Sequence, residues 1–380
     1  MIARYYLIYL FILLYSCVKA QFVQQNHRIN IKINKDLQTL YDDERKILSN
    51  WEKYLNTIET VYYHSPDTWS VVEKEKYWFP DIEVIYLASA TKMFREYSPV
   101  LLNIQRKDSI YILKTAFINS EKDIHSIFNV IVRENNEGEY IFSRYQDYYT
   151  QDWETIQIES ITFFCKDRTK FNYPEAKKSA NLSDSLANLF NTQTFQSRYY
   201  IFQSTEERLR AKGYDYTYLM YNTIQESADN DINNRIINSG EGAEYDPHEI
   251  VHTYLNQVYW NTLHNFVNEG IATFIGGNIE KSKERELSNL KKYLDLHKDL
   301  DLNNVTSVKK ASEGKTNIMY ALSAFLCKKV YEKEGIEGLK KLCLAGSLDS
   351  DVYRVIEEIL GVRQTELNQY LREEIKKAHY

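Results

Sequence analysis

The chain has 380 residues, of which 43% are hydrophobic, 14% aromatic and 26% charged, and this length predicts two or three domains. The aromatic content argues against disorder, while 12 glycines, 5 prolines and 4 cysteines exclude collagen-like, low-complexity and disulfide-stapled small proteins. A net charge of −6 leaves no broad basic surface for a nucleic acid, so we expect no nucleic-acid partner.

The first twenty residues predict a signal peptide. An uninterrupted apolar run from Tyr5 to Tyr15 is shorter than the ~20 residues that a membrane span needs. Val18 and Ala20 provide small residues at the positions that favour cleavage after Ala20, so we expect export and no transmembrane span in the mature chain. Cys17 leaves an alternative open, because it ends a segment that resembles a bacterial lipobox and would then be lipidated.

Residues 21–150 predict an N-terminal α+β domain. Apolar spacing typical of helices covers residues 36–60, 67–78 and 82–97. Alternation typical of strands follows at residues 100–105, 110–118, 127–132 and 140–145. Helices followed by antiparallel strands favour an α+β roll, and in the order of its elements this domain resembles the cone-shaped nuclear-transport-factor-2-like fold.

Residues 151–380 predict a second α+β domain, separated from the first by a polar stretch at residues 147–154. A helix is expected at residues 175–190, between strands at residues 156–164, 199–203 and 234–238.

The rest of this domain is expected to be mainly helical. Ser204 and Glu207 have the spacing of a capping box, so a helix is expected to begin there and to end near Gly213. From Asp246 onward nearly all the spacing is helical, and three glycines are expected at helix ends: Gly335, Gly346 and Gly361.

Three cysteines remain after residue 20, and their pairing is open. Cys327 and Cys343 could form a disulfide if their helices pack together, whereas the alternative is three buried thiols, including Cys165.

Residues 248–252 read His-Glu-Ile-Val-His, the pattern H-E-x-x-H. An Asp-Pro pair precedes them, and because these residues favour the N-cap and first helical positions, a helix is expected to begin here. Residues four apart share a helix face with Cβ atoms ~5–6 Å apart, so His248 and His252 can reach one zinc ion. Glu249 lies beside them, angled toward a metal-bound water.

The third ligand decides the class of metal site, because a catalytic zinc ion takes three protein ligands and keeps one open position. A metzincin would need a histidine where this chain has Val258, which excludes that class. Residues 267–273 read Val-Asn-Glu-Gly-Ile-Ala-Thr, and sixteen residues separate Glu269 from His252. HEIVH followed by NEGIAT resembles the gluzincin metallopeptidases, such as the aminopeptidase N, thermolysin and bacterial peptidase-MA-like types, over roughly residues 155–375.

The resemblance implies one Zn²⁺ per chain, held by His248, His252 and Glu269, with Glu249 as the general base. Zinc lowers the pKa of its bound water from ~15.7 towards ~7, and the base takes the proton as the water attacks a peptide carbonyl. Tyr320 is implied as a donor to the carbonyl oxygen, with a packing role as the alternative.

Two further polar residues near the motifs leave alternatives open. Thr273 shares a helix face with Glu269 and could hydrogen-bond a ligand or its own backbone. His264 lies about 140° around a helix from Glu269, which favours a pocket-edge or surface position over substrate contact. The remaining histidines are expected to be structural or exposed: His27, His64, His125, His297 and His379.

The aminopeptidase N family also carries a G-x-M-E-N segment whose glutamate binds the free α-amine of the substrate. This chain offers Gly242-Ala243-Glu244, which lies too close to the zinc helix. We therefore predict an exported zinc-dependent peptidase that cleaves peptide or protein substrates as an endopeptidase rather than an aminopeptidase. The alternatives are a gluzincin-like binding module or pseudoenzyme with a non-catalytic zinc site, and a scaffold without metal.

Overall fold

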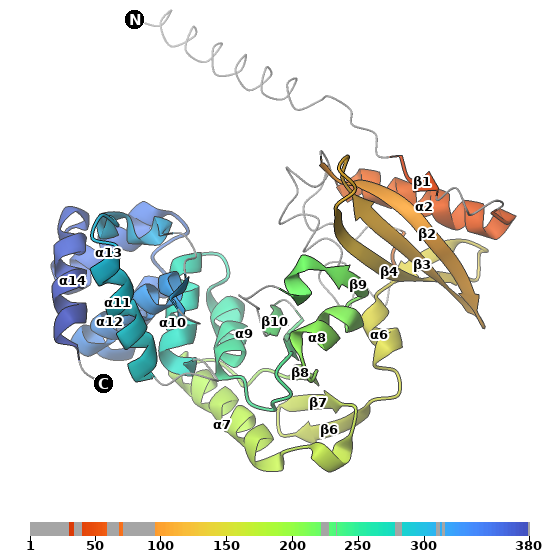
Figure 1. The fold of residues 1–380 in the computed structure, drawn as a ribbon. Helices are drawn as coiled ribbons and strands as arrows, with labels where there is room; N and C mark the ends of the chain where they lie inside the picture. Colours follow the sequence, from red (N-terminus) through yellow and green to blue (C-terminus); the bar gives the residue numbers. More distant parts are fainter. Residues whose placement is uncertain are drawn as a thin grey trace, which may run out of the picture. The chain divides into compact units, whose positions relative to one another are not determined.

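The computed structural model has an α+β fold, and its described residues form two compact units that divide between Ser143 and Arg144 (Figure 1). The described residues are 30–33, 40–58, 68–70, 96–221, 228–232, 234–277, 283–308, 312–313 and 316–378. The predicted signal peptide, Cys17 and nearly all of the predicted third helix lie outside these residues, as do His27, His64 and His379.

In unit 1, helix α2 (Asp42–Ile58) lies against a sheet with the strand order β1-β2-β3-β4-β5 (Figure 1). The strands are antiparallel neighbours except β1, which runs parallel to β2. Trp51 of α2 donates from Nε1 to Thr115 Oγ1 at 3.0 Å and packs edge-on against Phe142, so helix and sheet share a buried core. The strands are β1 (Lys32–Ile33), β2 (Ser98–Lys107), β3 (Ile110–Ile118), β4 (Ile124–Glu134) and β5 (Tyr140–Ser143).

Most predicted elements of this unit are confirmed, with one helix wrong at its start. The first helix is found as α2, and β2 to β5 occupy the four predicted strand positions. Residues 68–70, expected in a helix, instead form a turn and a bridge from Trp69 to Phe142. Their backbone hydrogen-bonds to that of Phe142, at 2.7 and 3.0 Å, so pairing with β5 replaces the helical pattern.

Unit 2 begins at Arg144, just before the polar stretch at residues 147–154 where the sequence placed the boundary, and its first helix is α6 (Tyr145–Tyr149). The side chain of Gln146 donates to Asn238 Oδ1 at 2.8 Å, which attaches α6 to the sheet of this unit. That sheet has the order β10-β11-β8-β7-β6, in which β11, β8 and β7 are parallel neighbours and β10 and β6 are antiparallel edges. Its strands are β6 (Glu154–Ile158), β7 (Ile161–Cys165), β8 (Ser197–Ile201), β10 (Ala228–Asp231) and β11 (Ile236–Ser239).

The single strand predicted at residues 156–164 is wrong, because this segment is the hairpin of β6 and β7. The chain reverses at Glu159, which adopts a left-handed backbone with φ of 51°. No glycine or proline marks this turn, so the sequence offered no signal for it. The short strands β9 (Tyr214–Thr217) and β10 were not predicted.

The two faces of the sheet in unit 2 pack against different helices. Phe163, Tyr199 and Ile237 join one core with α7 (Tyr173–Leu189) and α9 (Pro247–Tyr259). Tyr200, Phe202 and Ile236 form a smaller cluster on the other face with Ala211 of α8 (Thr205–Ala211). Ser204 caps α8 as predicted, by accepting from the Glu207 N–H at 3.1 Å.

The rest of unit 2 is mainly helical, as predicted, and the helices share the core of α7 and α9. Gly361 ends α13 in a left-handed conformation, and Gly335, also at positive φ, separates the two helical segments that make up α12. The helices are α10 (Asn265–Gly276), α11 (Lys283–Leu296), α12 (Ile318–Cys343), α13 (Asp349–Leu360) and α14 (Leu367–Lys377). Short elements complete the unit: β12 (Ser312–Glu313), β13 (Thr316–Asn317) and 3₁₀ turns Arg168–Lys170, Tyr218–Met220, Leu302–Ser307 and Gln364–Glu366.

Cys165, Cys327 and Cys343 are buried free thiols, which decides between the two alternatives for the cysteines. Burial raises the pKa of Cys327 to about 12, so this thiol stays protonated at neutral pH. Within the described part of the chain, no helix combines the length and the apolar character needed to cross a membrane.

Candidate metal centre

Helix α9 begins where the Asp-Pro pair predicts it. Asp246 is the N-cap, and its Oδ1 accepts from the Glu249 N–H at 3.2 Å, with Pro247 in the first turn. Burial, and after it the charge of Glu249, raises the pKa of the Asp246 carboxyl above its usual range. The cap therefore fixes the turn that carries both His248 and Glu249.

Two glycines permit close packing of helix α10, which carries Glu269, against α12 at Gly270 and against α9 at Gly276. A Cβ added at Gly270 would meet Ser323 Oγ and lie 2.9 Å from the backbone carbonyl carbon of Ser323, on α12. A Cβ added at Gly276 would lie 2.7 Å from the backbone nitrogen of His248, on α9. Neither position has room for a side chain, so the glycine of the NEGIAT segment has a packing role next to Glu269.

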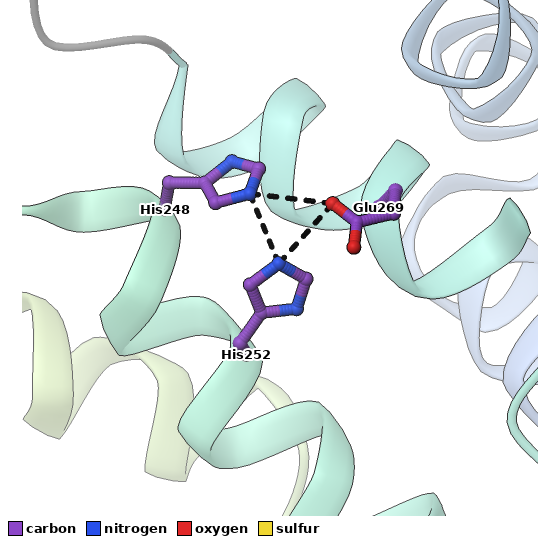
Figure 2. Close-up of side chains that lie close together, drawn as sticks. All are labelled: His248, His252 and Glu269. Carbon is purple, nitrogen blue, oxygen red and sulfur yellow. Dashed lines mark hydrogen bonds and ion pairs between the residues drawn. The ribbon is translucent and has the colours of Figure 1, made fainter. Parts of the chain in front are cut away.

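His248, His252 and Glu269 converge as the sequence predicts, each offering one ligand atom to a common point (Figure 2). The two Nε2 atoms are 2.9 Å apart, and Glu269 Oε2 lies 3.5 Å from that of His248 and 3.4 Å from that of His252. Two ligands at 2.0–2.1 Å from a tetrahedral zinc ion stand about 3.3 Å apart, close to all three separations.

The chemistry of these donors also fits a metal cation. Glu269 Oε2 is buried, yet among the described residues no donor reaches it with hydrogen-bond geometry. An ionised oxygen buried without a donor is costly, and a cation at the point of convergence removes that cost. Two imidazoles and one carboxylate form a ligand set that is typical of catalytic zinc.

Asn268, next to Glu269 in the sequence, orients His252. Its Oδ1 lies 2.8 Å from His252 Nδ1 and also accepts from Asn256 Nδ2 at 3.4 Å. Because an amide oxygen only accepts, this contact assigns the proton to Nδ1 and leaves the lone pair of a neutral His252 on Nε2. The amide thus supplies the type of outer contact that holds metal-ligating histidines in one orientation.

In the absence of metal, a proton on His252 stabilises the same arrangement. Burial lowers the pKa of His252, but its close contact with Glu269 and the charges of Glu249 and Glu269 outweigh it and raise this pKa to about 9. Burial likewise raises the pKa of Glu269, but its contacts with His248 and His252 win and hold that pKa well below its usual range. A proton and a metal ion therefore compete for one position.

The other sequence candidates lie around this cluster in different roles. Tyr320, in the first turn of α12, has its ring nearly parallel to that of His248, with centroids 6.0 Å apart. Thr273 Oγ1 is buried and makes no hydrogen bond within the described residues, so neither alternative, a bond to a ligand residue or to its own backbone, is seen there. His264 is the N-cap of α10, accepting from the Phe266 N–H at 3.1 Å and contacting Asp349 at 3.0 Å, which makes it structural.

Several residues that shape the site were missed from the sequence: Asn230, Thr253, Asn256, Gln257, Asn268 and Gly270. Asn256 follows His252 at the same four-residue interval that relates the two ligands, a helical spacing that could have indicated it. Asn268 directly precedes the predicted ligand Glu269. Asn230 is distant in sequence and could be found only through the fold.

The chain was compared with protein-family models and with curated proteins. No family model matches it, and no curated protein matches it. The geometry of His248, His252 and Glu269 therefore carries the functional argument.

Proposed function

We propose that this chain is an exported zinc-dependent peptidase that hydrolyses peptide bonds in peptide or protein substrates. The observation that carries the proposal is the convergence of His248, His252 and Glu269, with a buried carboxylate oxygen that lacks a donor among the described residues. The H-E-x-x-H and NEG patterns, similar to those of gluzincins, supply the class of reaction. Export rests on residues 1–20, outside the described part of the chain.

A bound Zn²⁺ supplies Lewis acidity and makes water available as hydroxide near neutral pH. Glu249 follows His248 on α9 and lies outside the ligand set, which suits a general base. As the water oxygen bonds to the peptide carbonyl carbon, Glu249 accepts the water proton. It then donates that proton to the amine nitrogen as the carbon–nitrogen bond breaks, so atoms and protons balance.

Tyr320 is the proposed donor to the oxygen of the attacked carbonyl. Its ring faces His248, which places it beside the ligands. Asn317 caps α12 by accepting from the N–H groups of Met319 and Tyr320, at 3.1 and 3.4 Å, which fixes the turn that carries the tyrosine. Removing such a donor costs ~2.7–4 kcal/mol of transition-state stabilisation, the loss expected for Tyr320→Phe.

Cleavage within a chain fits the site better than removal of an N-terminal residue. The acid nearest to the aminopeptidase pattern, Glu244, is buried, and its carboxylate accepts from the Asn172 N–H at 2.9 Å. It is thereby engaged with the start of α7, and its position gives no support to a role in binding an α-amine.

The test measures zinc content and cleavage of casein, with and without a chelator. We expect one zinc ion per chain, loss of cleavage on chelation, and a 10²–10⁴-fold loss in Glu249→Gln with zinc retained. Equal cleavage by wild type and Glu249→Gln would contradict the mechanism. A zinc-loaded protein that is inert on a broad peptide library would instead favour a gluzincin-like binding module.

A further inference from the structure

Helix α9 carries a second polar stripe beside its metal ligands. Glu249, Thr253 and Gln257 recur at four-residue intervals and therefore lie along one side of the helix. This stripe contacts the edge strand β10 and the residue after it. Gln257 Nε2 donates to the carbonyl of Ile232 at 2.6 Å, which attaches the far end of the stripe.

Asn230 of β10 joins the first two members of the stripe in a closed triangle of hydrogen bonds. Its Nδ2 donates to the backbone carbonyl of Glu249 and to Thr253 Oγ1, both at 2.9 Å. Thr253 Oγ1 in turn donates to the same carbonyl at 3.1 Å. Both amide hydrogens of Asn230 are used, and the triangle is part-buried, with Thr253 1% exposed.

The alternation of β10 explains why this amide faces α9. Asn230 lies opposite Ile237, whose side chain belongs to the core shared with α9. The preceding residue, Asp229, points to the other face, where its carboxylate contacts Arg208 and accepts from Lys212 Nζ at 2.7 Å. The strand is thus held from behind by α8 and offers α9 a fixed point of attachment.

We propose that Asn230 is a positioning residue for the general base Glu249. The carbonyl and side chain of Glu249 share one Cα, so a bond that fixes the peptide plane also fixes the direction of the Cα–Cβ bond. The Thr253 hydroxyl and the Asn230 amide both bond the Glu249 carbonyl, so this peptide is fixed from two directions. This inference rests on the proposed function, because it gives Glu249 the role of base.

The test compares Asn230→Leu, which keeps the branched shape without the donors, with Asn181→Ala, a matched loss of an exposed asparagine on α7. For a casein-derived peptide we expect kcat to fall roughly 10–100-fold in Asn230→Leu, with KM and zinc affinity within about threefold of wild type. In the zinc-loaded variant, amide hydrogen exchange should accelerate in residues 247–257. If Asn230→Leu does not fold, Thr253→Val removes the hydroxyl of the triangle and should change the same quantities in the same direction.

Three results would overturn the proposal. The first is that Asn230→Leu has the same kcat and the same amide hydrogen exchange as Asn181→Ala. The second is a fall in zinc affinity as large as the fall in kcat, which would assign Asn230 to the ligands. The third applies if the zinc-loaded wild type cleaves no peptide, in which case the proposed function fails. If amide hydrogen exchange in residues 247–257 of Asn230→Leu is then also unchanged, Asn230 has no positioning role either.

Discussion

Two polar clusters in unit 2 contain buried charge and differ in how that charge is balanced. Around Asp229, the chain supplies both signs, because Arg208 and Lys212 contact its carboxylate and Asn238 donates to it at 2.8 Å. Around Glu269, the chain brings acceptor atoms together, and Oε2 is buried without a donor in hydrogen-bond geometry among the described residues.

The difference separates a cluster whose charge is balanced by the chain itself from one whose donor set fits an added cation. Taking a carboxylate out of water is costly unless charge and hydrogen bonds are restored inside the protein. Asp229 receives opposite charge from Arg208 of α8 and from Lys212, and a hydrogen bond from Asn238 of β11. Glu269 has a protonated His252 as a partial substitute, and a metal ion would replace that proton. Changes to the cluster around Glu269 and to the cluster around Asp229 should therefore have different effects.

The largest effect is expected on metal affinity. Glu269→Gln keeps the shape of the side chain but removes the charge that a cation needs. Since changing an outer contact of a ligand already costs 10–100-fold in affinity, loss of a ligand charge should weaken zinc binding more than roughly 100-fold. Competition with a fluorescent chelator measures this value, with Glu373→Gln, an exposed acid on α14, as the control. Equal zinc affinity in both variants would remove Glu269 from the ligand set.

A substitution in the cluster around Asp229 should lower the stability of the protein and not its metal affinity. Asp229→Asn removes the negative charge that Arg208 and Lys212 contact. Breaking a fully buried pair costs 3–5 kcal/mol, and because the Asp229 side chain is 28% exposed we expect about 2–3 kcal/mol. Urea unfolding of the metal-free protein measures the loss. If the free energy of zinc binding falls by more than the free energy of unfolding does, the clusters around Asp229 and Glu269 are not independent.

Close packing beside the metal centre gives the next prediction. In Gly270→Ala the new methyl group meets Ser323 on α12, where the backbone carbonyl carbon cannot yield as a flexible side chain can. Overpacking of this kind costs about 1–3 kcal/mol, and a shift of α10 would also displace Glu269. Unfolding and zinc titration should both weaken. Gly277→Ala is the contrasting variant, since a Cβ there meets no atom within 4 Å, although its positive φ adds strain.

The sequence was most informative where a local pattern decides local structure. The Asp-Pro start of α9 and the histidines four residues apart follow from helical geometry, whereas the glutamate on the next helix is what the resemblance to gluzincins implies. The two histidines and the glutamate do converge. Residues that act through the fold could not be found in this way. The role of Gly270 depends on its contact with Ser323, and the role of Asn230 depends on its contact with α9. Each contact is set by how elements distant in the sequence pack.

The errors have physical causes as well. Glu159 turns the chain with a left-handed backbone that glutamate rarely adopts, so the hairpin of β6 and β7 had no glycine to mark it. His264 caps α10, although serine, threonine, asparagine and aspartate are the preferred N-caps. In both places the surrounding structure overrides a weak local preference.

The smallest effect expected is the pH dependence of the metal-free protein. The pKa of His252 is raised from an ordinary value near 6.5 to about 9, so the folded state binds a proton that the unfolded state loses. The resulting stabilisation is fully present below pH 6.5 and is lost as pH rises through 9, at about 1 kcal/mol per pH unit between pH 7 and 9. Under the proposed function, zinc would take the position of that proton, so the zinc-loaded protein should lack this slope and metal binding at pH 7.5 should release a proton. Urea unfolding at pH 7, 8 and 9 with and without zinc measures the slope, and an equal slope in metal-free His252→Gln would assign it to other groups.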